Sequence, residues 1–153
     1  MIKKLDHKII GISKKIRSIF QASYIVEAKL LQVKDFPPLK RAIDDFLSSE
    51  AEFYGYYKDH EMVAVIEIKK YKDSTHIQSL VVDPKFFRQG IAQSLISYLF
   101  DSLDSVIYTV ETGAENQPAV TLYKKNGFVE IERYYAEFDI RKVRFERRIT
   151  AKS

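Results

Sequence analysis

Apolar residues recur every three or four positions in two early stretches of the chain. The first stretch predicts one long helix over roughly residues 7–30. Pro37 and Pro38 break the chain after it, and the second stretch predicts a short helix over residues 39–47. Residues 2–5 predict a short strand ahead of both helices.

From residue 52 the pattern changes to short runs rich in β-branched and aromatic residues. Runs at 52–57, 62–69 and 76–82 are separated by polar turns, which predicts three antiparallel strands. Strand alternation predicts that two sets of side chains lie on opposite faces of the third strand. One set is His76, Gln78, Leu80 and Val82, and the other is Ile77, Ser79 and Val81.

Helical spacing returns in the run FFRQGIAQSLISYLF, which predicts a helix starting near Gln89. Residues 106–111 predict another strand. The run NQPAVTLYKKN over 116–126 then predicts a further helix, because Pro118 lies in its first turn and Gly127 lies just past its end.

Residues 128–135 and 137–147 predict a final pair of strands. The apolar positions change phase within the second of them, which predicts a bulge near Arg141 or Lys142. The predicted order is therefore strand, two helices, three strands, helix, strand, helix, two strands. This order indicates an α/β fold in which helices cover a mixed sheet.

Composition narrows the class of protein. The chain has 153 residues, 46% hydrophobic and 30% charged, which suits one domain over residues 1–150. It has no cysteine, which excludes disulfides, thiolate metal sites and a cysteine acyl-enzyme. We expect a cytoplasmic protein with no membrane association, because no segment approaches the roughly 18 apolar residues of a membrane span. A net charge of +4 mildly favours an anionic ligand without identifying it.

The run VVDPKFFRQGIA leads from a predicted strand through a short loop into a helix. Its small residues Gly90 and Ala92 let main-chain N–H groups approach a ligand closely, and the start of a helix favours a pyrophosphate. This pattern predicts an anion site. A plain strand-to-helix turn in which Gly90 relieves crowding is the alternative.

The run NQPAVTLYKKNGF places Asn116 before a helix and Tyr123 two turns into it. A tyrosine hydroxyl has an ordinary pKa of about 10, which suits a proton donor to a departing thiolate. Tyr123 is therefore a candidate catalytic residue, and a half-buried aromatic without chemistry is the alternative.

The segments FRQGIA and NQPAVTLYKKNGF, about thirty residues apart and in this order, resemble the two signature segments of the GCN5-related (GNAT) acyltransferases. The resemblance covers roughly residues 50–135. A weaker likeness, to mostly uncharacterised bacterial members of the family, extends through the segments SYIVEAKLL and DFPPL. It implies a mixed, mostly antiparallel sheet of about seven strands with four helices. One position departs from the family pattern RxxGxG or QxxGxA, because Phe87 stands where the pattern has Arg or Gln and Arg88 follows one place later.

The resemblance also implies acetyl-CoA as the acyl donor, with no metal. Its pantetheine arm would lie between the strands 76–82 and 106–111, with the pyrophosphate on main-chain amides at the start of the following helix. The residues implied in donor binding are Leu80, Val81, Val82, Arg88, Gln89, Gly90, Ile91, Ala92, Gln93, Asn116 and Tyr123.

The predicted activity is transfer of the acetyl group to a primary amine by direct attack in a ternary complex. An amine of ordinary pKa must lose a proton before it attacks, so the site needs a base. His76 is one candidate, because it stands where histone acetyltransferases of this family keep a catalytic glutamate. Glu111, acting through water, is a second. Tyr123 would protonate the thiolate, and an N–H near residues 80–82 would stabilise the oxyanion.

Three other functions remain open at this point. The acceptor amine could belong to a protein or peptide, or the chain could be a non-catalytic regulator that binds acyl-CoA. A nucleic-acid partner is disfavoured, because the basic run from Arg141 to Arg148 is more typical of a charged edge strand. The oligomeric state stays open, a homodimer included.

Overall fold

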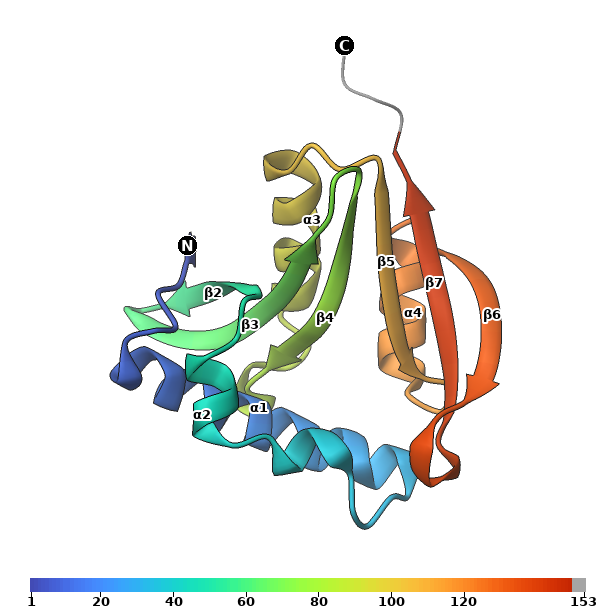
Figure 1. The fold of residues 1–153 in the computed structure, drawn as a ribbon, viewed down its shortest axis with the longest axis horizontal. Coiled ribbons are helices and arrows are strands. Elements are labelled where there is room, and N and C mark those ends of the chain that lie inside the picture. The colour runs from blue at the N-terminus through green and yellow to red at the C-terminus, as the bar shows by residue number, and fades with distance from the viewer. Residues whose placement is uncertain (150–153) are drawn as a thin grey trace.

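The computed structural model describes residues 1–149, in which seven strands form one sheet of order β1-β2-β3-β4-β5-β7-β6 (Figure 1). Neighbouring strands are antiparallel except β4 and β5, so the predicted element order and mixed sheet are confirmed. The strands are β1 (Ile2–Lys4), β2 (Glu52–Lys58), β3 (Glu61–Lys70), β4 (Ser74–Val82), β5 (Ile107–Gly113), β6 (Val129–Tyr135) and β7 (Arg141–Arg148). The helices are α1 (Ile10–Leu31), α2 (Ile43–Leu47), α3 (Ile91–Ser102) and α4 (Gln117–Lys125).

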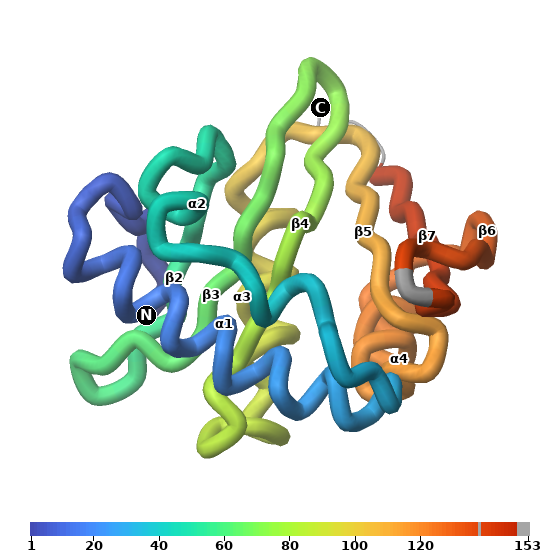
Figure 2. The backbone as a smooth tube through the Cα atoms, turned by 60° about the horizontal axis from the view of Figure 1, so that its bottom comes forward, coloured from blue at the N-terminus to red at the C-terminus, as the bar shows by residue number. Residues whose placement is uncertain are grey.

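Helices cover both faces of the sheet. Figures 1 and 2 show α1 and α2 on one side and α3 and α4 on the other. On the first side, Phe20 of α1 and Phe46 of α2 pack on Val65 of β3. On the other side, Leu95 of α3 and Tyr123 of α4 belong to a second cluster. The central strand β3 is buried on both faces, which explains its continuous apolar sequence.

The parallel pair β4 and β5 is only partly formed. Its four residue pairs join Ser74–Ile77 to Ile107–Val110. Past these pairs the two strands diverge, and residues 78–82 of β4 and 111–113 of β5 have no partner across the gap. This split in the sheet sets the position of the candidate site.

The predicted alternation along β4 is wrong, because the strand contains a β-bulge. Ser79 pairs with Glu67 of β3 and Ile77 pairs with Ile68, so Gln78 is an extra residue. Because of this extra residue, the side chains before Gln78 point to the opposite face from the one that simple alternation predicts. Ile77 therefore packs on the side of α3 and α4 together with Leu80 and Val82. On the other face, Ser79 hydrogen-bonds to Glu67 and Val81 packs beneath α1.

The bulge predicted near Arg141 or Lys142 is also wrong. Residues 137–139 form a 3-10 turn, and β7 begins only at Arg141. The turn resets the apolar phase, and the register shift lies instead in the neighbouring strand β6, between Glu130 and Glu132.

The segment between α1 and α2 is held against α1 by side-chain hydrogen bonds. The helix predicted over 39–47 is divided into a 3-10 turn at Pro37–Lys40 and the short helix α2. Gln21 of α1 donates to the Leu39 carbonyl at 2.8 Å, and Arg17 donates to the Arg41 carbonyl at 3.2 Å. Residues 36–41 therefore form a fixed wall beside the split in the sheet.

Candidate active site

A cleft of about 1110 Å³ opens where β4 and β5 diverge. One end is formed by the loop before α3 and by the start of that helix. The other end is formed by the last turns of α1, residues 36–41 and the β6–β7 connection. Asn116, the N-cap of α4, and Tyr123, within α4, also line the cleft. Both segments of the family resemblance therefore line the cleft, and so does α1, which belongs to neither segment.

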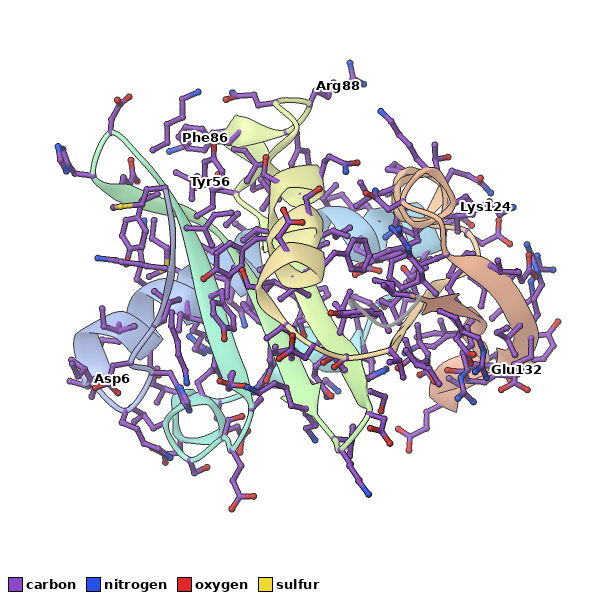
Figure 3. The ribbon with its side chains drawn as sticks, turned by 90° about the horizontal axis from the view of Figure 1, so that it is seen from above. Asp6, Tyr56, Phe86, Arg88, Lys124 and Glu132 are labelled. Carbon is purple, nitrogen blue, oxygen red and sulfur yellow. The ribbon has the colours of Figure 1, made fainter. Side chains whose placement is uncertain are left out.

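The start of α3 presents main-chain donors to the cleft. Arg88 and Gly90 have positive φ values of 64° and 73°, which turn the loop sharply into the helix. No side chain of residues 1–149 caps this helix start, and first-turn N–H groups have no partner within a helix. Such amides and the helix dipole favour an anion. Figure 3 shows Phe86 and Arg88 on this loop, beside α3.

The predicted donor-binding residues of this region do not all line the cleft. Those that do are Arg88, Gly90, Ile91, Ala92 and Gln93. Gln89 is exposed and does not; its side chain accepts a hydrogen bond from Lys58 at 2.5 Å. The amide of Gln93 is engaged by Asn126 at 2.5 and 2.8 Å, which fastens α3 to the end of α4. A ligand would therefore meet the main chain of Gln93.

The free edge of β4 is the second source of main-chain groups. The Asp83 N–H donates to the Val63 carbonyl of β3 at 2.8 Å. Because successive residues of a strand turn their main-chain groups to opposite edges, Val81 also faces β3, whereas Leu80 and Val82 face the cleft. Leu80 and Val82 line the cleft and Val81 does not.

Tyr123 of α4 lines the cleft. The residue is 5% exposed, and its ring packs against Phe128 and Phe145, with centroids 5.5 and 6.0 Å away. Within residues 1–149 its hydroxyl makes no hydrogen bond, and it is open to the cleft. Burial, followed by the charges of Tyr24 and Glu27, raises the pKa of Tyr123. The hydroxyl therefore keeps its proton at neutral pH and is available to a ligand.

Sequence reasoning missed two cleft residues on α1, Tyr24 and Glu27. Asn116 Nδ2 donates to Glu27 Oε1 at 3.0 Å, while Asn116 Oδ1 caps α4 by accepting from the Ala119 N–H at 3.3 Å. Burial, followed by the nearby Glu27 charge, raises the pKa of Tyr24, which also hydrogen-bonds to Ser79. Spacing along α1 indicated only a core-facing helix, so no local signal marked either residue.

The two candidate bases occupy different places. Glu111 lines the cleft, and burial followed by a hydrogen bond to Glu111 raises the pKa of Tyr134. His76 does not line the cleft; its Nδ1 lies 2.7 Å from Thr109 Oγ1 on the neighbouring strand. Burial lowers the pKa of His76, and the charge of Glu111 partly opposes this effect. Glu111 is thus the better placed of the two to contact a ligand.

Comparison with known proteins identifies the family. Residues 27–149 match the acetyltransferase (GNAT) domain family. The chain belongs to the GNAT family. It is also 33% identical to the UPF0157 protein YqkA of Bacillus subtilis over 133 residues, which are 86% of this chain and 39% of that protein. The chain therefore spans well under half the length of this curated relative.

Solved GNAT structures share the fold. The ribosomal-protein-S18-alanine N-acetyltransferase of Escherichia coli superposes with a TM-score of 0.79 at 21% identity, covering 100% of this chain and 96% of that one. The PaiA N-acetyltransferase of Thermoplasma acidophilum, in complex with coenzyme A, gives 0.75 at 14% identity, covering 97% and 98%. At these identities the likeness establishes the GNAT architecture alone.

Two further properties of this GNAT domain concern metals and membranes. Among residues 1–149, no cluster of three or more histidine, aspartate and glutamate side chains is arranged to hold a metal ion. The same residues include no helix with the length and apolar character that a membrane crossing requires.

Proposed function

We propose that this GNAT domain is an acetyl-CoA-dependent N-acetyltransferase that acetylates a primary amine by direct attack in a ternary complex. One observation carries the proposal. The main-chain donors around Gly90 and the unpartnered hydroxyl of Tyr123 face the same cleft, which opens at the split between β4 and β5. This arrangement suits a long ligand with an anionic group at one end and a leaving sulfur at the centre.

The residues of the cleft divide the task of donor binding. The first-turn amides of α3 would hold the pyrophosphate. The cleft-facing main-chain groups of Leu80 and Val82 would hydrogen-bond to the amides of the pantetheine arm, because they lack a strand partner on that edge. Asn116 lines the cleft between these groups and Glu27, and would lie beside the arm.

The chemical step needs a base and a group that stabilises the leaving thiolate. We assign the base to Glu111, directly or through water, because it lines the cleft, and keep His76 as the second candidate. As the amine nitrogen bonds to the acetyl carbon, its proton passes to Glu111 and the carbon–sulfur bond breaks. A main-chain N–H at Leu80 or Val82 stabilises the oxyanion. The protonated Tyr123 hydroxyl donates to the departing sulfur, whose thiol has an ordinary pKa of about 8.5.

A thiol-release assay with acetyl-CoA across amines, amino acids, polyamines and peptides tests the proposal. Titration calorimetry with acetyl-CoA runs alongside it. We expect acceptor-dependent thiol release that falls about 100-fold in Glu111→Gln and less than about threefold in His76→Gln. A larger decrease in His76→Gln than in Glu111→Gln would indicate that His76 is the base. Tight binding of acetyl-CoA without acceptor-dependent release would instead indicate a regulator, and no binding would contradict the proposal as a whole.

A further inference from the structure

Glu27 is a carboxylate placed where no structural role fully accounts for it. It lies near the end of α1, half-buried, and lines the cleft. Asn116 donates to Oε1, whereas Oε2 makes no hydrogen bond with residues 1–149. Burial raises the pKa of Glu27, while the Asn116 hydrogen bond and the Lys142 charge oppose the rise. A carboxylate in this setting gains from a cationic partner that replaces the water it has lost.

The hydroxyl of Tyr123 points independently to a ligand beside Glu27. Tyr123 is only 5% exposed, yet its hydroxyl has no partner within residues 1–149 and faces the same cleft. No buried side-chain nitrogen or oxygen of residues 1–149 lacks a partner, so this hydroxyl is open to the cleft. A ligand that enters the cleft can replace water as its hydrogen-bond partner. The Glu27 charge acts on both Tyr123 and Tyr24, so the three groups surround one region. A molecule bound there would contact the reacting centre.

Apolar side chains form much of the wall of the cleft at the end near α1. The apolar side chains that line it are Leu30, Leu31, Phe36, Pro37, Pro38 and Ile140. Phe36 and Ile140 are packed together in a small core cluster and are only 5% and 7% exposed. These side chains offer no hydrogen bonds, so a peptide backbone lying against them would lose the hydration of its amides. A hydrocarbon stem fits the same surface without that loss.

The ionisable groups at this end disfavour an acceptor that carries its own carboxylate. Glu27, Glu111 and Glu137 line the cleft here together with Lys142, whose charge acts on Glu27. Arg41 also lines it, but its guanidinium is engaged by both carboxylate oxygens of Glu67, at 2.7 and 2.8 Å. The remaining charge is therefore negative, which attracts an ammonium and repels a carboxylate.

We propose that Glu27 binds the ammonium group of the acceptor, and that the acceptor is a small amine on a hydrocarbon stem with no carboxylate beside the nitrogen. This inference rests on the proposed acetyl transfer and specifies its substrate class. Glu27 is a specificity residue: it holds the amine beside Tyr123, while Glu111 receives the proton. Selectivity should therefore appear mainly in KM for the amine.

Acceptors that differ only in the carboxylate test the inference. Thiol release is measured with 3-methylbutylamine, leucinamide and leucine, which share one side chain, and with the amidated peptide Leu-Gly-Gly. For the unmodified protein we expect kcat/KM for 3-methylbutylamine at least about tenfold above that for leucine or for the peptide. Leucinamide separates the charge of the carboxylate from its bulk, so it should fall between the two extremes.

Glu27→Gln removes the charge and keeps an acceptor for Asn116. We expect KM for the amine to rise about tenfold and its preference over leucine to fall within about threefold. The kcat and the acetyl-CoA affinity should change little. Glu115→Gln is the matched control, because Glu115 is exposed, pairs with Arg141 at 3.4 Å and does not line the cleft. Glu27→Asp, which keeps the charge, should retain the preference even if Glu27→Gln folds poorly.

The possible results separate the two proposals. If leucine is acetylated as fast as the amine, the inference is overturned and acetyl transfer stays intact. Such a result would indicate that Lys142 binds the leucine carboxylate. Faster turnover of the peptide would overturn the small-amine class in the same way. An unchanged amine KM in Glu27→Gln would remove Glu27 from acceptor binding. Absence of thiol release with every compound would count against both proposals.

Discussion

The two ends of the cleft are built from different parts of the chain. At the end near α3, the groups that face the cleft belong mainly to the main chain, at Gly90 and the first turn of a helix. At the end near α1, they are side chains on elements distant in sequence, among them Glu27 and Ile140. Main-chain donors suit a ligand that is the same in every protein of one fold. Side chains can be substituted from one protein to another without disturbing the fold, so they suit a ligand that differs. The first end therefore suits the proposed acyl donor and the second the proposed acceptor, and we call them the donor end and the acceptor end.

A partly buried ion pair between Arg41 and Glu67 anchors one end of the wall formed by residues 36–41, and its loss should produce the largest effect. Glu67 is 1% exposed and binds Arg41 through both oxygens. In Glu67→Gln the guanidinium loses its counter-charge, so we expect the free energy of unfolding to fall by about 3 kcal/mol. Urea denaturation measures the change. Acetyl-CoA affinity should fall much less than amine affinity, because Arg41 holds residues 36–41.

The control for this ion pair is Glu52→Gln. Glu52 bridges Lys4 at 2.8 Å and Lys70 at 3.0 Å, but both lysines are largely exposed. Solvent screens such pairs, so we expect a loss of less than about 1 kcal/mol. Equal losses in the two variants would show that Arg41 and Glu67 do not stabilise the wall in the way we infer.

Between the two ends, Tyr123→Phe should give the next largest effect. The ring and its contacts with Phe128 and Phe145 remain, and only the unpartnered hydroxyl is lost. We expect kcat to fall about 100-fold, or about 2.7 kcal/mol of barrier, while acetyl-CoA still binds. Thiol release and calorimetry measure the two quantities. Tyr135→Phe, on an exposed tyrosine, is the control; a decrease of less than about tenfold in Tyr123→Phe would remove its assigned role.

At the donor end, Gly90→Ala tests the main-chain donors. An added Cβ would meet no atom within 4 Å, so its effect comes from the φ of 73°. Left-handed backbone costs a non-glycine residue about 1–2 kcal/mol, and relief of this strain would move the first-turn amides. We expect the Kd for acetyl-CoA to rise about tenfold with amine selectivity unchanged. Gly11→Ala in α1, also free of contacts, should leave binding intact and stabilise the helix slightly.

The smallest effect concerns His76, which lies where β4 and β5 part. Burial lowers the pKa of His76, so the unfolded chain binds this proton more readily than the folded chain does. Stability should therefore fall as the pH drops below about 6.5, the ordinary value for histidine. Urea denaturation at about pH 7.5 and pH 5.5 should show a smaller difference for His76→Asn than for the unmodified protein. His60→Asn, on an exposed turn, is the control variant for the substitution itself.

The end of the cleft near α3 could be predicted from the sequence, because the main-chain turns that form it require particular residues at particular places. Gly90 supplies a left-handed turn, and Asn116 with Pro118 starts α4, so each has a local cause that the pattern reveals. The order of helices and strands could also be predicted, because the change in hydrophobic period from one element to the next is a local signal. Tertiary contacts then determined the bounds, as in the division of the predicted helix 39–47 by Arg41 and Ala42.

The acceptor end was not accessible in this way. Glu27 gains its setting only when α1 packs beside Asn116, 89 positions away along the chain. The bulge at Gln78 was also hidden, because a run of apolar residues such as Leu80 to Val82 reads the same with either face inward. Long-range packing determines both features, and hydrophobic periodicity does not contain it.

The short pairing of β4 with β5 has a consequence for how a ligand could stabilise the protein. After four residue pairs the hydrogen-bonded ladder stops, although both strands continue. An extended molecule carrying its own amide groups would add the missing rungs and act as an interior strand of the sheet. The two halves of the sheet, which four residue pairs already join, would then be joined over a greater length of both strands.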